Sequence, residues 1–140
     1  ALPEGKGWSP LTWQILEGRN EITNTLFEAV DKVDAGRIFL QNNIVFDGYE
    51  LLEELHRKQG ESINALVLEF VDKYQNIQGR TQDGKESFYR KRSHLDSELE
   101  PNKTLAEQFN LLRIVDNEKY PAFFKHQSHK YILKIYKEEE

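Results

Sequence analysis

A long amphipathic helix predicted between residues 47 and 74 is the feature that most constrains the fold of this 140-residue chain. Apolar side chains recur there at steps of three and four residues, the pattern of a helix that lies on a hydrophobic core. Its apolar positions are Leu52, Leu55, Ile63, Leu66, Phe70 and Tyr74. Asp47 and Glu50 form a D-x-x-E capping box at its start, and Gly60 is a candidate for a kink. A helix of this length crosses a small domain, so the other elements must pack against it.

Two segments before this helix, residues 24–30 and 37–46, are rich in branched and aromatic side chains and predict β-strands. Asn42 and Asn43 interrupt the second segment and predict a bulge or a change of direction. Strands combined with helices in this way predict a protein of the α/β class.

A shorter helix is predicted in the sequence WSPLTWQILEG. Ser9 is a good N-cap, Pro10 suits the first helical position, and Gly18 can adopt the left-handed conformation that ends a helix.

Residues 75–103 are polar and show no lasting periodicity, which predicts a long irregular loop. Loops of this length are usually functional or disordered. Phe88 and Tyr89, followed by the basic run at 90–92, favour a functional loop. We expect a ligand or a partner to help order it.

The C-terminal part predicts one more helix and a β-hairpin. Thr104 and Glu107 make a capping box for a helix with Leu105, Phe109 and Leu112 on one side, ended by residues 116–117. Two strands are then predicted on either side of a turn at residues 127–128.

Composition excludes several classes of protein. The net charge is −5 and the only basic cluster is at residues 90–92, so broad binding to nucleic acid is not expected. No apolar run is long enough to span a membrane, and the start of the chain is not a signal peptide. The absence of cysteine excludes disulfides and favours the cytoplasm. The four histidines lack metal-ligand spacing, so we expect no metal site.

Asp34 stands between apolar residues, just before a glycine and a predicted strand. From the residues alone it is either a turn-former or a catalytic acid. The motifs around it favour the second interpretation. The sequence LPEGKGWSPLTWQILEG, followed by ITNTLFEAVDKVDAGRIFLQ, resembles the formyltransferases that use 10-formyltetrahydrofolate. The positions that match the motifs of that family are Leu2, Pro3, Lys6, Gly7, Pro10, Thr25, Leu26, Val33, Asp34, Gly36 and Ile38.

The resemblance implies a catalytic role for Asp34. In the family an acid of this kind acts with a histidine that assists proton transfer and an asparagine that stabilises the oxyanion. It also implies that 10-formyltetrahydrofolate is the co-substrate. The residues expected at its site are Leu2, Pro3, Gly7, Val33 and Asp34.

The family's asparagine and histidine precede the Leu-Pro block, and this chain starts at Ala1. We therefore expect the C-terminal portion of a formyltransferase Rossmann-like domain at 1–74, and an α+β extension with a terminal β-hairpin at 75–140. The missing N-terminal half is the expected partner, the strands should leave an open parallel edge, and the chain alone should be inactive.

The sequence NLLRIVDNEKYPAFF is similar to the end of sugar N-formyltransferase domains, which favours a nucleotide-linked amino sugar as the acceptor. Aromatic rings can stack on its base, and arginines can bind its diphosphate. The residues expected to bind it are Trp8, Phe88, Tyr89, Arg90, Arg92, Arg113 and Tyr120. A methionyl-tRNA formyltransferase and a non-catalytic binding module are the alternatives. The apolar stripe of the long helix also suits a homodimer.

Overall fold

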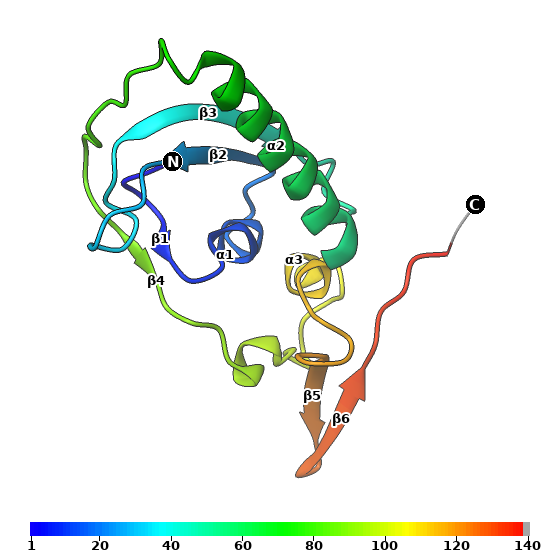
Figure 1. Ribbon diagram of the computed structural model, residues 1–140. Helices are drawn as coiled ribbons and strands as arrows, with labels where there is room; N and C mark the ends of the chain where they lie inside the picture. Colours follow the sequence, from blue (N-terminus) through cyan, green and yellow to red (C-terminus); the bar gives the residue numbers. More distant parts are fainter. Residues whose placement is uncertain (139–140) are drawn as a thin grey trace.

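The computed structural model describes residues 1–138 and contains both helices and strands, as the α/β prediction requires (Figure 1). The helices are α1 (Pro10–Leu16), α2 (Leu52–Lys73) and α3 (Phe109–Arg113), with a short 3₁₀-helix η1 (His94–Ser97). The strands are β1 (Lys6–Gly7), β2 (Glu21–Phe27), β3 (Ile38–Val45), β4 (Phe88–Tyr89), β5 (Ala122–His126) and β6 (His129–Leu133). Within residues 1–138, no helix is long and apolar enough to cross a membrane.

The strands β2 and β3 pair antiparallel, and α2 lies along them (Figure 1). The pairing within this sheet is antiparallel, and the expected open edge for a parallel upstream strand stays a prediction. The predicted bulge at Asn42 and Asn43 is wrong, because these residues pair in regular register with Asn24 and Thr23. The Asn42 side chain contacts α2, where its Oδ1 accepts a hydrogen bond from the Ser62 hydroxyl at 2.6 Å. The shift in register lies between Leu26 and Phe27.

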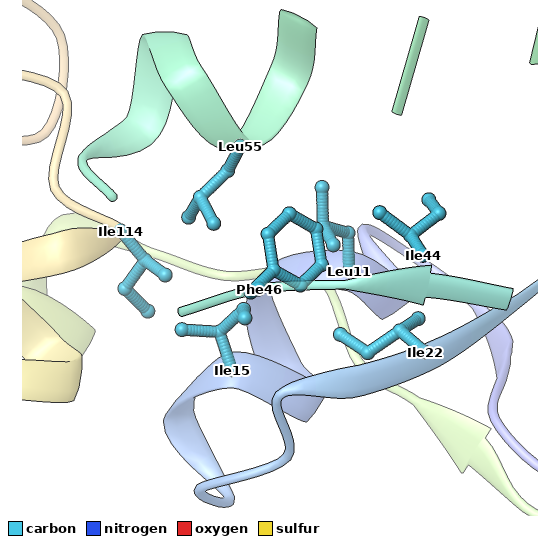
Figure 2. Packing of buried hydrophobic residues seen from close by; sticks show 7 residues of the cluster. All are labelled: Leu11, Ile15, Ile22, Ile44, Phe46, Leu55 and Ile114. Atoms are coloured by element: carbon cyan, nitrogen blue, oxygen red, sulfur yellow. The ribbon is translucent and has the colours of Figure 1, made fainter. Parts of the chain in front are cut away.

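One hydrophobic cluster joins α1, the β2–β3 pair, α2 and the segment after α3 (Figure 2). Its buried members are Leu11, Ile15, Ile22, Ile44, Phe46, Leu55 and Ile114. Burying each such side chain contributes about 1.5–3 kcal/mol. This cluster therefore holds α1, the β2–β3 pair and α2 against one another.

The helix α2 is a single 22-residue element, but it begins five residues after Asp47 and buries only part of its predicted stripe. The Glu50 carboxylate accepts the N–H groups of Asp47 and Gly48, so this segment is a turn ahead of the helix. Leu55 and Leu66 are buried, whereas Tyr74 is 67% exposed.

The helix predicted from Thr104 is wrong over its first half. Thr104 and Glu107 do form the hydrogen bonds of a capping box, but the residues between them make a turn, and α3 starts only at Phe109. The terminal hairpin is confirmed, because β5 and β6 pair antiparallel. The turn residues Gln127 and Ser128 both have positive φ, as a tight two-residue hairpin requires.

Candidate functional site

Asp34 lies in the connection between β2 and β3, with its carboxylate held against the start of the chain. Its Oδ2 accepts a hydrogen bond from the Gly7 N–H at 2.8 Å. The backbone of Asp34 is left-handed, with φ of 52°, a conformation that few non-glycine residues adopt. The two interpretations of Asp34 are thus compatible: it stands in a turn, and the turn presents its carboxylate.

Gly36 makes this turn possible by a close backbone approach. A Cβ at position 36 would lie 1.8 Å from the carbonyl oxygen of Glu28. The Glu28 N–H donates to the Arg37 carbonyl at 2.9 Å, which closes the connection. The sequence motif includes a glycine at position 36, and the structure gives the steric reason for a glycine there.

A cavity of about 190 Å³ opens beside Asp34. Its walls come from the first residues of the chain, α1, both strands of the β2–β3 pair and α2. The lining residues are Ala1, Leu2, Glu4, Gly5, Gly7, Pro10, Leu11, Gln14, Ile22, Thr23, Asn24, Thr25, Phe27, Asp34, Ile44 and Gln59. The lining combines apolar side chains with a few polar groups, which is the usual composition of a ligand site.

The residues predicted to bind the co-substrate are only partly brought together. Leu2, Gly7 and Asp34 line the cavity. Pro3 is buried and is not among the lining residues; it follows a cis peptide bond, and its carbonyl accepts from the Ser87 N–H at 3.4 Å. Val33 is 65% exposed and is absent from the lining, so the structure does not support its assignment to this site.

Residues 80–92, which we call the strap, run past β1 toward η1 (Figure 1). The strap begins with a two-way backbone pairing of Arg80 with Ile38. Further along, the Ser87 carbonyl accepts from the Lys6 N–H at 2.9 Å, and β4 pairs parallel with β1. Contacts within the chain therefore hold this loop at both places, and the expected help from a ligand or a partner stays a prediction.

Lys6 and Glu86 add an ion pair between β1 and the strap. The Lys6 side chain is buried, and its Nζ lies 2.7 Å from Glu86 Oε1. This hydrogen bond lowers the pKa of Glu86, since the ammonium group favours the charged carboxylate.

An aromatic–basic cluster lies where the strap meets α1, and it consists of Trp8, Trp13, Tyr89, Arg90 and Lys91. The Trp13 and Tyr89 rings stack with centroids 6.0 Å apart and planes 8° from parallel. The guanidinium of Arg90 lies 4.9 Å from the Trp13 ring, and the Lys91 ammonium lies 5.0 Å from the Trp8 ring. Trp8 is 58% exposed. The Trp8 N–H donates to the Tyr89 carbonyl at 3.1 Å, which places the cluster next to Gly7.

The Tyr89 hydroxyl donates to Glu17 at 2.9 Å. Burial and this hydrogen bond raise the pKa of Tyr89 to about 12, so the phenol stays protonated at neutral pH. The cluster therefore offers flat rings and positive charge without a competing phenolate.

Arg113 does not bind substrate from the position that the structure gives it. Its side chain is 0% exposed and pairs with Glu50 at 3.0 Å. It also donates to Asn20, Asn110 and the Glu50 carbonyl. The prediction is wrong because Arg113 joins α3 to the segment before α2 inside the protein.

The other predicted substrate-binding residues are separated from one another. Phe88 is exposed on β4, where the Lys6 ammonium lies 5.9 Å from its ring. Arg92 is half-buried and donates to the Ile114 carbonyl at 3.2 Å. Tyr120 lies near the C-terminal hairpin, where its carbonyl accepts from the Ser97 hydroxyl. Phe88 alone of these three shares a strand with the aromatic–basic cluster.

Sequence reasoning missed Gln82, whose side chain binds the Asp34 turn. A glutamine in a polar loop gives no signal of its own, because nothing in the local pattern shows what it contacts 48 residues earlier in the chain.

No family model matches the chain. A methionyl-tRNA formyltransferase from Thermotoga neapolitana is 31% identical over 90 residues, which are 63% of this chain and 29% of that protein. The solved methionyl-tRNA formyltransferase from Clostridium thermocellum superposes with a TM-score of 0.79 at 24% identity, over 99% of this chain and 60% of that one.

Solved sugar formyltransferases have the same fold. A likely sugar N-formyltransferase from Mycobacterium tuberculosis superposes with a TM-score of 0.78 at 21% identity, over 99% of this chain and 62% of that one. The formyltransferase PseJ from Anoxybacillus kamchatkensis, solved with a UDP-linked formamido sugar and tetrahydrofolate, superposes with a TM-score of 0.57 at 23% identity. That match covers 64% of this chain and 48% of that one.

The chain therefore has the fold of the formyltransferases over nearly its whole length. The resemblance found from its motifs, to the C-terminal part of that family, is confirmed by the sequence match and by these structures. The chain spans about 60% of the solved formyltransferases that it matches over its whole length. Both methionyl-tRNA and sugar formyltransferases are among these similar proteins, so the comparisons do not distinguish between the two acceptors.

Proposed function

We propose that this chain forms one side of the active site of an N-formyltransferase. In this proposal a formyl group moves from 10-formyltetrahydrofolate to the amino group of a nucleotide-linked amino sugar. The observation that carries it is the pairing of β1 with β4. This pairing sets the aromatic–basic cluster beside Gly7, and Gly7 holds the carboxylate of Asp34.

The residues at the cavity suit the reacting end of a folate. Apolar side chains can cover a flat ring, and the polar groups of Gln14, Thr23 and Asn24 can bond its heteroatoms. A cavity of about 190 Å³ is smaller than the 300–1,000 Å³ of most ligand sites, so the described residues line only part of a folate site.

The chemistry requires one proton to move. The amine nitrogen of the acceptor attacks the formyl carbon, a new C–N bond forms, and the bond from that carbon to N10 of the folate breaks. The proton lost by the amine ends on N10, which leaves tetrahydrofolate. A fixed carboxylate is suited to orient the group that carries this proton and to stabilise its charged form. Asp34 is fixed in this way by the Gly7 N–H.

Charge supports a nucleotide sugar over tRNA as the acceptor. The chain carries a net charge of −5, and tRNA binding depends on an extended basic surface. The aromatic–basic cluster offers stacking rings for one base, and the Lys91 ammonium for a diphosphate, in a small area, while Arg90 is paired with Asp96. The absence of cysteine supports a cytoplasmic location. Formylation of methionyl-tRNA is the second candidate, because the 31% identical relative is an enzyme of that kind.

The test uses the full-length protein with 10-formyltetrahydrofolate and either a UDP- or dTDP-linked amino sugar or initiator methionyl-tRNA. Release of tetrahydrofolate and the mass of the acceptor report transfer. We expect the sugar to be formylated and Asp34→Asn to lower kcat by about 100-fold or more. Asp31→Asn, at an exposed acid of the same connection, is the control and should change kcat less than about twofold.

Each alternative has its own outcome. Transfer to tRNA alone favours the second candidate, and binding of either acceptor without transfer favours a non-catalytic module. Full activity of Asp34→Asn refutes the proposed role of Asp34.

A further inference from the structure

The side-chain amide of Gln82 connects the strap to the turn that carries Asp34. Its Nε2 donates to the Asp34 carbonyl at 2.8 Å and to the Gly36 carbonyl at 2.8 Å. These two carbonyl groups lie on either side of Ala35. One NH₂ group therefore binds the turn at two points.

The turn needs such a donor because its two carbonyl oxygens converge on one nitrogen. Converging carbonyl dipoles repel each other unless a donor lies between them, and Asp34 is in the left-handed region at the same place. Gly36 has no room to shift toward Glu28, whose carbonyl oxygen a Cβ would meet at 1.8 Å. Relaxation of the turn would therefore have to move Asp34.

The orientation of the Gln82 amide follows from its partners. Two acceptors face one end of the amide, so the NH₂ group must point toward the turn. The opposite atom, Oε1, is buried and has no hydrogen-bond partner among the described residues. A buried acceptor without a partner disfavours folding. The contribution of Gln82 is thus concentrated in its two bonds to the turn.

We propose that Gln82 is a positioning residue, which holds the turn so that the Asp34 carboxylate stays against the Gly7 N–H beside the cavity. This inference rests on the proposed role of Asp34 in formyl transfer. Gln82 itself does not line the cavity, so it acts through Asp34.

The experiment compares Gln82→Met with Gln78→Met in the full-length protein. Methionine keeps most of the side-chain volume and removes the donor, and Gln78 is an exposed glutamine that precedes the strap. We expect Gln82→Met to lower kcat by about 10- to 100-fold while KM for both substrates changes less than about threefold. Gln78→Met should match the wild type.

A second measurement needs no activity. The Gly7 amide is protected by its bond to Asp34, so its hydrogen exchange, followed by NMR, should accelerate by about tenfold in Gln82→Met. The Leu55 amide, inside α2, should exchange at the wild-type rate.

Wild-type kcat in Gln82→Met, or unchanged exchange at Gly7, would overturn the proposal. If Gln82→Met accelerates exchange at Gly7 and Leu55 equally, Gln82→Asn is measured in the same way. Equal acceleration in that variant too would mean that Gln82 supports the whole fold, which also overturns the proposal. A wild-type protein that transfers no formyl group refutes the proposed function, while exchange at Gly7 still decides what Gln82 holds.

Discussion

Replacement of Glu50 by glutamine should destabilise the protein strongly at neutral pH and much less in acid. The Glu50 carboxylate is buried, and it lies 3.0 Å from the Arg113 guanidinium and 2.7 Å from the Lys58 ammonium. Glutamine keeps the shape of the side chain but removes its charge. The variant therefore leaves the fully buried Arg113 without a counter-ion.

The size of the effect follows from the pKa of Glu50. Burial raises it, but hydrogen bonds from Lys58 and from the N–H groups of Asp47 and Gly48 outweigh burial and lower it from 4.5 to about 2. That difference corresponds to about 3 kcal/mol of stability at neutral pH. An unpaired buried arginine costs about 3–5 kcal/mol, so we expect a loss in this range for Glu50→Gln at pH 7.

The pH dependence has a definite sign. The folded-state pKa is the lower one, so the contribution of Glu50 is complete above about pH 4.5 and is lost as the pH falls toward about 2. By pH 3, about 2 kcal/mol of it should be gone. The difference between wild type and Glu50→Gln should shrink by that amount between pH 7 and pH 3.

Urea unfolding, followed by tryptophan fluorescence and by circular dichroism, measures both quantities. Glu61→Gln, at an exposed acid of α2, is the control and should cost less than about 0.5 kcal/mol. The double variant Glu50→Gln/Arg113→Met should recover part of the loss, because it removes the unpaired charge. A loss below about 1 kcal/mol at pH 7, or one that does not change with pH, would refute this reasoning.

Two further changes test the Asp34 turn and the end of the strap. Gly36→Ala should reduce formyl transfer by about 100-fold without unfolding α2, because the new Cβ must push the turn away from Glu28. Kinetics measures the transfer, and circular dichroism reports whether α2 is folded. A fully active variant would contradict the steric argument. Asp96→Asn removes the ion pair with Arg90 and weakens the acceptor of the Ser93 N–H. If the strap loses about 1 kcal/mol of local stability, trypsin should cleave it about fivefold faster. An unchanged cleavage rate would show that these contacts do not hold the strap.

Features governed by neighbouring residues were predictable from the sequence. Pro10 and Gly18 marked both ends of α1, and Gly18 has the positive φ of a helix stop. The alternation after Tyr120 placed the terminal hairpin and its turn. The motifs around Asp34 assigned Asp34 and Gly7 to one expected site, and the structure brings these two residues together; the resemblance carried long-range information that local patterns lack.

Features governed by distant partners were not predictable. The charge of Arg113 gave no sign that it would be buried, because Glu50 stands 63 residues away in the sequence. The capping residues Thr104 and Glu107 formed their local bonds without the helix, since a cap does not supply the core contacts that stabilise a short helix. The strap had no periodicity because its order comes from partners in other segments.

The pairing of β1 with β4 bears on the order in which the protein assembles. The Lys6–Glu86 ion pair joins residues that are 80 apart in the sequence, so a long loop must close before these contacts form. The β2–β3 hairpin and α2 close much shorter loops and should form earlier on the folding pathway. The strap is then the last part to dock and the first to detach under mild denaturant. The proposed formyl transfer should therefore disappear while α2 is still folded. During synthesis, the chain must extend past Gln82 before that side chain can bind the turn that carries Asp34.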